Sequence, residues 1–314
     1  MEKIKYSVVV PIYKSEALLD RLLIALGELN ARLDGYMEAV FVVDGSPDAS
    51  FSKLKKNLPS LGYAAQLILL SRNFGAFSAI RQGLQDAAGQ YFAVLAADLQ
   101  EPPELILSFF TALEKGECDV AVGSRKKRAD PLMQRMASNI FWAIYRKWVM
   151  KDIPAGGVDI FGCNQLFREQ LLRLEEAHTS LIAQIFWLGY ERKYFEYDRL
   201  ARNTGKSSWS FNRKINYMLD SIFSFTDLPI KLLIFVGSAG CLFSIVLSAA
   251  VLISYWLGKI NVPGYAATIL VVLFFGALNL LGIGIVGNYG WRSYENTKRR
   301  PLTLISFKTT NDNQ

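Results

Sequence analysis

The sequence has little of the two residue types that most often build metal centres and cross-links. Its 314 residues include three cysteines, Cys118, Cys163 and Cys241, and one histidine, His178. Three cysteines so far apart, with no Cys-x-x-Cys spacing, argue against a disulfide framework and against a zinc site. A single histidine argues against a His-based metal centre. We expect His178 to be a surface or core residue rather than part of a Ser-His-Asp triad.

Charge is absent from two long stretches in the last third of the chain. No Asp, Glu, Lys or Arg occurs in 232–258 or in 260–291. Each stretch exceeds the ~20 residues that cross a bilayer as a helix. We therefore predict two transmembrane helices within 232–291, joined by a short external loop, with two buried core helices as the alternative. Basic residues flank the pair, so the positive-inside rule places both termini in the cytoplasm.

The chain is basic overall, with 35 Lys and Arg against 28 Asp and Glu. The basic residues gather beside the apolar runs, which favours anionic lipid or a phosphorylated substrate over nucleic acid. Segment 125–151 mixes eight basic residues with aromatic ones at helical spacing, and 209–227 is similar. We interpret both as amphipathic helices at a membrane interface. An ordinary helix packed on a sheet is the alternative for the first.

The first 124 residues alternate between short apolar runs and helical periodicity. Predicted strands cover 6–10, 39–43, 66–70, 91–96 and 120–122, and the clearest helices cover 16–33 and 103–115. Continuously apolar strands between helices indicate a parallel sheet covered on both faces. Ligands bind beyond the carboxyl ends of such strands. We therefore expect function in the polar segments 11–16, 44–48, 72–75, 98–101 and 123–128.

Asp98 follows one of these apolar strands directly. A carboxylate there suits Mg²⁺ or Mn²⁺, ions that take oxygen ligands and bridge to substrate phosphates, and Gln100 adds a carbonyl oxygen. The alternative is that Asp98 caps the helix that begins at Pro102-Pro103. The spacing does not separate the two. Asp48, which follows Pro47, reads better as a helix cap than as a ligand.

Motifs at 8–16, 43–48, 72–75 and 97–103 occur in a set order. Together they resemble the family 2 inverting glycosyltransferases of GT-A fold. Within that family they are similar to the polyisoprenyl-phosphate glycosyltransferases, which include bactoprenol glucosyltransferases and dolichol-phosphate mannose synthases. The resemblance continues through 123–125, the region of Asp159, 202–209, both apolar runs and 298–301, so it covers nearly the whole chain.

The resemblance implies a role for each group of residues. A nucleotide sugar donor would be held by Pro11, Tyr13, Glu16, Asp44, Arg72, Asn73 and Asp98. The metal would be held by Asp98 and Gln100, and Asp159 would act with Asp98 in catalysis, near the sugar. The phosphate of the lipid acceptor would be clamped by Arg125, Arg135, Arg202 and Lys206, because arginine suits bidentate phosphate recognition. The alternative for 125–128 is contact with anionic headgroups.

Three positions differ from the family pattern. Ala96 stands where the family commonly has the first carboxylate of an Asp-x-Asp metal motif, and Ala76 stands where a lysine is common. The segment around Asp159 lacks the arginine that close bactoprenol glucosyltransferases have. The first difference weakens metal binding or leaves a place for a donor phosphate. The third bears on whether the sugar is glucose.

The resemblance and the residue patterns predict four regions. These are a cytoplasmic GT-A domain (1–210), a juxtamembrane amphipathic helix (211–231), two transmembrane helices (232–291) and a cytoplasmic basic tail (292–314). The expected reaction moves a hexose, with UDP-glucose as the favoured donor, to undecaprenyl phosphate at the cytoplasmic leaflet of a bacterial inner membrane, for surface polysaccharide modification.

Three alternatives remain beside this reading. The sugar could be GlcNAc, mannose or an amino sugar, and the chain could be a non-catalytic membrane scaffold that retains the fold. A processive polysaccharide synthase is disfavoured, since there are two apolar runs and no Gln-x-x-Arg-Trp motif. Relatives that assemble as tetramers make a homotetramer an open expectation.

Overall fold

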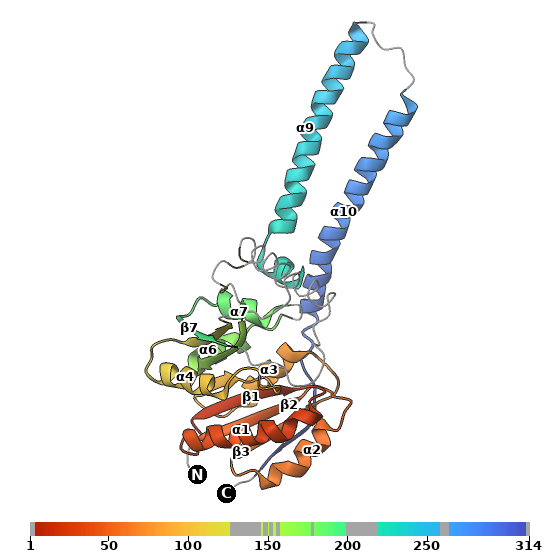
Figure 1. The fold of residues 1–314 in the computed structure, drawn as a ribbon. Coiled ribbons are helices and arrows are strands. Elements are labelled where there is room, and N and C mark those ends of the chain that lie inside the picture. The colour runs from red at the N-terminus through yellow and green to blue at the C-terminus, as the bar shows by residue number, and fades with distance from the viewer. Residues whose placement is uncertain are drawn as a thin grey trace. The chain divides into compact units, whose positions relative to one another are not determined.

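A computed structural model describes residues 4–125, 146, 150, 153–154, 158–176, 179–198, 219–257 and 264–311. The chain divides into two compact units. The sheet unit comprises Met1–Lys214 and Arg300–Gln314, and the helical unit comprises Ile215–Arg299. Figure 1 shows the mixed sheet of the first unit and the two long helices of the second.

The sheet unit contains one eight-stranded sheet in the order β7-β5-β6-β4-β1-β2-β3-β8. Its strands are β1 (Tyr6–Ile12), β2 (Met37–Val43), β3 (Ala64–Leu70), β4 (Tyr91–Val94), β5 (Val120–Arg125), β6 (Val158–Asn164), β7 (Arg192–Tyr197) and β8 (Ile305–Thr310). The pairs β1–β2, β1–β4, β2–β3 and β5–β7 are parallel, and the three pairs made by β6 and β8 are antiparallel. The sheet is therefore mostly parallel, as predicted.

Helices cover both faces of the sheet, which explains why the central strands are apolar at every position. On one face lie α1 (Leu19–Arg32), α2 (Ser50–Asn57) and α4 (Pro103–Glu114), and on the other lie α3 (Ala76–Asp86) and α6 (Gln165–Leu172). Short 3-10 turns at Glu16–Leu18 and Leu58–Ser60 precede α1 and follow α2, and α7 (Leu181–Trp187) precedes β7. Successive residues of a strand point to opposite faces, so both sets must be apolar here.

Each of the five predicted strands differs from the structure at one end, and the first and fourth have a clear cause. The first strand continues through Pro11 to Ile12, whereas the predicted strand ends at residue 10. Proline is tolerated because β4 pairs only with Tyr6–Val9, so Pro11 has a strand neighbour on the β2 side and needs no ladder donor on the other. The fourth strand ends at Val94, two residues early, because the chain turns at Ala96.

The C-terminal segment corrects the predicted domain boundaries. We expected 292–314 to be a separate basic tail, but Ile305–Thr310 forms β8 and pairs antiparallel with β3. Ile305, Phe307 and Thr309 alternate with Ser306, Lys308 and Thr310, which is the pattern of a strand. The prediction of a basic tail considered only the charges of this segment. Residues 300–314 therefore belong to the sheet unit.

The helical unit contains α9 (Leu228–Trp256) and α10 (Tyr265–Thr297). Within the described residues, one stretch, Leu228–Leu247, is long and apolar enough to cross a membrane, and its window of residues is unburied. Residues 219–225 are helical. They pack on the end of α10, where Arg292 donates to Asp220 over 2.7 Å and Tyr289 Oη donates to the carbonyl of Thr226 over 3.3 Å.

Several predicted features lie outside the described residues. These are the basic aromatic segment 126–145, all of 199–218, and the residues His178, Arg135, Arg202 and Lys206. They stay predictions.

Candidate active site

The sheet topology brings most of the predicted site residues to one edge. Strands β1, β2, β3 and β4 run parallel, so the segments that follow them, which begin at Tyr13, Asp44, Ser71 and Leu95, leave the sheet on the same side. The antiparallel β6 enters at that edge, because Val158 pairs with Ser124 near the end of β5. The carboxyl edge is the place where ligands bind in such sheets.

Asp44, directly after β2, is the carboxylate that joins this edge to the segment after β3. Its two oxygens accept the backbone amides of Phe74 and Gly75 over 2.7 and 2.8 Å, and its carbonyl accepts the Asn73 side-chain amide over 3.3 Å. The side chain is 2% exposed. Burial raises the pKa of the Asp44 carboxyl above its ordinary value, although the two amides and the charge of Arg72 act in the opposite direction.

These contacts define a segment that we call the donor loop, residues 71–75, between β3 and α3. Gly75 precedes α3 at φ 98°, and Gly45 opposite it adopts φ 54°. A Cβ at Gly45 would lie 2.3 Å from the backbone carbon of Arg72, so only glycine fits there. The donor loop is thus closely packed against the end of β2.

Arg72 and Asn73 present exposed side chains at the tip of the donor loop. The guanidinium of Arg72 lies 4.1 Å from the ring centroid of Phe74, a cation–π contact. This contact orients the guanidinium while leaving it in solvent, where an anionic ligand can reach it. Both residues lie near Asp44, and their role in donor binding stays a prediction.

The ends of β1 and β2 are joined by a second set of hydrogen bonds. The Lys14 amide donates to Ser46 Oγ over 2.7 Å, and Lys14 adopts φ 52°. Glu16 and the 48–49 turn exchange two bonds. The Glu16 amide donates to Asp48 Oδ2 over 3.1 Å, and the Ala49 amide donates to Glu16 Oε2 over 3.2 Å. Glu16 therefore holds the β2 loop in place, while Tyr13 remains 38% exposed beside it.

Asp48 behaves as the helix cap that the sequence analysis favours. Its Oδ1 accepts the amide of Ser50, the first residue of α2, over 3.2 Å and the hydroxyl of Ser46 over 2.7 Å. Partial burial acts to raise the pKa of Asp48, but hydrogen bonds from Ser46, Ser50 and the Glu16 amide outweigh it, so the pKa lies below its ordinary value.

Asp98 lies in a tight turn after β4 and is half-buried. Its Oδ1 accepts the Gln100 amide over 3.4 Å, and Leu99 between them adopts φ 48°. Helix α4 begins at Pro103 with Pro102 at its N-cap position, so the alternative that Asp98 caps this helix is wrong. The Gln100 side chain is 7% exposed, so it faces inward at this turn.

The described residues contain no group of three or more His, Cys, Asp or Glu side chains that could hold a metal ion jointly. Mg²⁺ is commonly bound through one or two carboxylates plus substrate phosphates. One half-buried carboxylate, Asp98, at the carboxyl edge that also carries the exposed Arg72 fits that second kind of site. The protein ligands present here therefore suit a metal ion that binds together with a diphosphate.

The backbone of Asp159 lies at the same edge. On β5, Gly123 pairs with Ile160 and Ser124 with Val158, so Asp159 is the extra residue of a β-bulge. Bulges are common beside active sites, where they re-aim a side chain. Arg125 ends β5 and pairs with Tyr197 of β7. Of the predicted acceptor-binding residues, Arg125 is the one within the described part of the chain.

Two contributors to this site, the backbone amides of Phe74 and Gly75, are not visible in the sequence. Amides carry no residue signature, although a glycine just before an amphipathic helix indicates a special backbone angle at this position. A mostly parallel sheet with converging polar loops at its carboxyl edge defines a Rossmann-like α/β fold with a candidate ligand site at that edge.

Comparison with known proteins identifies the family. The model of glycosyl transferase family 2 matches residues 7–191. An uncharacterised glycosyltransferase of Synechocystis is 30% identical over 303 residues, covering 96% of this chain and 95% of the relative. The undecaprenyl-phosphate 4-deoxy-4-formamido-L-arabinose transferase of Photorhabdus laumondii is 32% identical, covering 99% and 97%. The bactoprenol glucosyl transferase of Shigella phage SfX is 27% identical, covering 97% and 99%. This chain belongs to glycosyl transferase family 2 and is a glycosyltransferase.

Proposed function

We propose that the chain transfers a hexose from a nucleotide sugar to undecaprenyl phosphate with inversion at the anomeric carbon. The observation that carries the proposal is the near-full-length similarity to relatives named for undecaprenyl phosphate and bactoprenol. UDP-glucose is the donor we favour. Another sugar is the alternative, since those relatives are named for different sugars.

The donor would bind at the ends of β1, β2 and β3. Pro11, Tyr13, Glu16 and Asp44 would hold the base and ribose, and Arg72 with Asn73 would face the diphosphate. The Asp44 carboxylate already accepts two amides, and each of its oxygens keeps a second lone pair for a ligand donor. Asp98, with Gln100, would hold Mg²⁺ or Mn²⁺, which would neutralise the leaving diphosphate.

The transfer itself needs little proton movement. An oxygen of the acceptor phosphate bonds to the anomeric carbon while the bond from that carbon to the nucleotide diphosphate breaks, and the nucleoside diphosphate leaves with the electron pair. A phosphate monoester is anionic near neutral pH, so a general base is less necessary than for a hydroxyl acceptor. Positioning and electrostatics would dominate. Asp159 would orient the sugar, and Arg125, Arg135, Arg202 and Lys206 would clamp the acceptor phosphate.

The lipid acceptor requires a membrane site. We propose that α9 and α10 are two transmembrane helices of a bacterial inner membrane and that both termini are cytoplasmic. The unburied apolar stretch Leu228–Leu247 supports the first span. The charge-free part of α10, 265–291, supports the second. The segments 125–151 and 211–231 would keep the acceptor phosphate at the headgroups. A homotetramer is a further possibility for native mass spectrometry to test.

A radiolabelled-donor screen tests the proposal. Full-length protein in detergent is mixed with undecaprenyl phosphate, Mg²⁺ or Mn²⁺, and UDP- and GDP-sugars in turn. We expect label to move into the organic phase with one donor, which then names the sugar. No transfer with any donor, from protein that is folded and supplied with lipid, would contradict the proposal and favour the scaffold alternative.

Asp98→Asn is the matching variant, with Glu104→Gln as its control. Glu104 is an exposed carboxylate in the first turn of the following helix. We expect Asp98→Asn to abolish transfer at an unchanged melting temperature and Glu104→Gln to leave both intact. Near-normal turnover of Asp98→Asn would overturn the metal role.

In the same assay, Arg202→Ala should impair use of the lipid acceptor more than donor binding.

A further inference from the structure

The last strand of the chain is bound to both elements that carry the donor loop. Strand β8 pairs with β3, which leads into the loop, with Gln66 opposite Thr310 and Leu69 opposite Phe307. Ahead of β8, the carbonyl of Leu304 accepts the amide of Ser71 over 2.8 Å. Ser71 is the first residue of the donor loop, so the C-terminal segment holds the point where the loop leaves the sheet.

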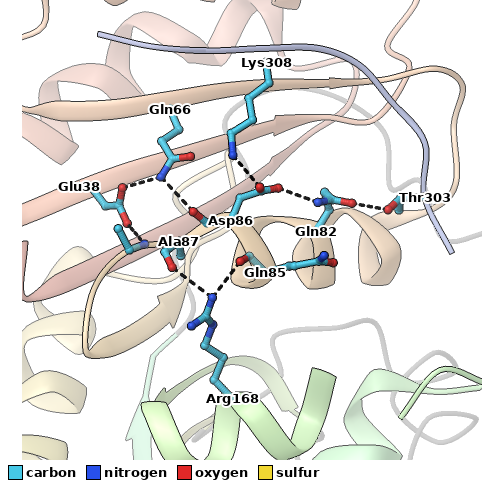
Figure 2. A network of polar contacts seen from close by, with 10 residues as sticks. Glu38, Gln66, Gln82, Gln85, Asp86, Ala87, Arg168, Thr303 and Lys308 are labelled. Carbon is cyan, nitrogen blue, oxygen red and sulfur yellow. Dashed lines mark hydrogen bonds and ion pairs between the residues drawn. The ribbon is translucent and has the colours of Figure 1, made fainter. Parts of the chain in front are cut away.

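The same segment is also hydrogen-bonded to α3, the helix that follows the donor loop. Figure 2 shows a chain of polar contacts between them. The Thr303 hydroxyl donates to Gln82 Oε1, the Gln82 amide donates to Asp86 Oδ2 over 2.6 Å, and Lys308 Nζ donates to Asp86 Oδ1 over 2.6 Å. Gln82 is 7% exposed, whereas the Lys308 side chain is 41% exposed, so the network runs from a buried residue out to solvent. The network ties two points of the C-terminal segment to two turns of α3.

The far end of the segment is anchored firmly. The backbone amide of Ala65 donates to Asn311 Oδ1 over 2.6 Å, and the side-chain amide of Asn311 donates to the carbonyls of Leu58 and Tyr63 over 3.2 and 2.9 Å. The ring of Phe307 meets that of Phe51 on α2 at 5.4 Å between centroids. The segment is therefore docked on both faces of the sheet edge and can act as a fixed support.

We propose that the C-terminal segment is part of the donor site, with Thr303 and Leu304 as positioning residues for the donor loop. The amides of Phe74 and Gly75 reach the Asp44 carboxylate only if β3 ends and α3 begins at the right places. The segment bonds to Ser71 on one side of the loop and to Gln82 on the other. It therefore sets the separation of the two loop ends. This inference rests on the proposed function for the identity of the ligand, but not for the shape of the loop.

Thr303→Val tests the proposal because it keeps the shape of the side chain and removes the donor hydroxyl. Thr303→Ser restores the hydroxyl. Thr309→Val is the matched control, since Thr309 lies on the same segment and its hydroxyl donates to the carbonyl of its neighbour Thr310. All are made in the full chain. Asn311→Ala serves as a second variant that loosens the far anchor.

The first measurement is amide hydrogen exchange without any substrate. We expect Thr303→Val and Asn311→Ala to speed exchange at Phe74 and Gly75 about fivefold, the factor for one typical net hydrogen bond. Thr303→Ser and Thr309→Val should match the parent chain, and the amides of β1 should be unchanged in all variants. Equal exchange at Phe74 and Gly75 in Thr303→Val and Thr309→Val would overturn the proposal, whatever reaction the protein catalyses.

The second measurement separates positioning from mere stability. With the donor found by the screen above, Thr303→Val should raise the KM for the nucleotide sugar about fivefold and leave the KM for the lipid phosphate unchanged. Thr303→Ser should restore the donor KM. A faster-exchanging loop with an unchanged donor KM, or equal changes in both KM values, would overturn the role in the donor site. Absence of nucleotide-sugar binding by the parent chain would refute the proposed function instead.

Discussion

The two units of this protein place their apolar residues in opposite ways. In the sheet unit, Phe41 of β2 is fully buried on the face of the sheet that α1, α2 and α4 cover. In the helical unit, Phe243 of α9 is 63% exposed and Leu242 beside it is 65% exposed. Burial of one such side chain is worth about 1.5–3 kcal/mol, so a helix that exposes many of them needs an apolar environment. The comparison supports the proposal that α9 lies in a membrane, whereas the sheet unit has a close-packed core of its own.

The largest expected effect is a loss of folding free energy when a buried phenylalanine of the sheet unit is truncated. The same truncation in the helical unit should have almost no effect. Phe41→Ala should destabilise the sheet unit by about 3–5 kcal/mol, because it leaves a cavity in a close-packed core. Phe243→Ala should change the same unfolding transition by less than about 0.5 kcal/mol. Urea unfolding of full-length protein in detergent, followed by circular dichroism, measures both. Similar losses would show that Phe243 packs against protein.

Introducing an arginine into each unit tests the same comparison through membrane integration. Phe243→Arg should reduce membrane integration, because arginine at the centre of a membrane helix costs about 2.5–3.5 kcal/mol. Ile24→Arg is the matched control, since Ile24 of α1 is 64% exposed in the sheet unit and should accept the charge. The fraction of protein retained in membranes after alkaline extraction is the measurement. Full retention of Phe243→Arg would contradict a membrane role for α9.

Glycines offer a smaller test of the same difference. A Cβ at Gly83 of α3 would lie 2.3 Å from Val9 Cγ1, whereas a Cβ at Gly284 of α10 has no atom within 4 Å among the described residues. Gly83→Ala should destabilise the sheet unit by about 1–3 kcal/mol through overpacking, less about 1 kcal/mol that alanine gains in a helix. Gly284→Ala should leave the melting temperature in detergent unchanged. A clear loss there would indicate a second chain packed on α10.

The smallest expected effect is a difference between Asp44 and Asp48 of the sheet unit in how their contributions to stability depend on pH. The pKa of Asp44 is raised on folding, so its contribution to stability is present at low pH and is lost as pH rises through the folded pKa. The pKa of Asp48 is lowered, so its contribution is present at neutral pH and is lost as pH falls through the folded pKa.

Urea unfolding at pH 7 and pH 3 measures this difference. On acidification, the parent chain should gain stability relative to Asp44→Asn and lose stability relative to Asp48→Asn. A change of the same sign for both variants would contradict the opposite environments of the two carboxyls.

Local patterns carried most of the fold prediction. The strands at Tyr6–Ile12, Met37–Val43 and Ala64–Leu70 are continuous apolar runs, and a run that is buried on both faces shows in the sequence whatever lies beside it. The positions of Asp98 and Asp44 at the carboxyl edge follow from the same pattern, since each is the first charged residue after such a run. The family motifs then added roles that residue spacing does not supply.

The features that were missed depend on contacts between distant parts of the chain. Strand β8 is short and polar on one side. Its partner β3 lies about 240 residues earlier, so no local pattern predicts that the two strands pair. Helix α2 was missed because its exposed face is dominated by lysine and serine. The antiparallel course of β6 between β4 and β5 likewise depends on pairing rather than on composition.

The sequence by itself determined that the chain is an α/β glycosyltransferase with long apolar C-terminal stretches, because periodicity, charge-free length and motif order are properties of neighbouring residues. The tertiary structure alone decided that Asp44 binds the amides of the donor loop and that the last strand returns to support that loop. Hydrogen bonds between backbone groups leave no trace in side-chain identity. They form only when the fold has brought the two segments to within about 3 Å.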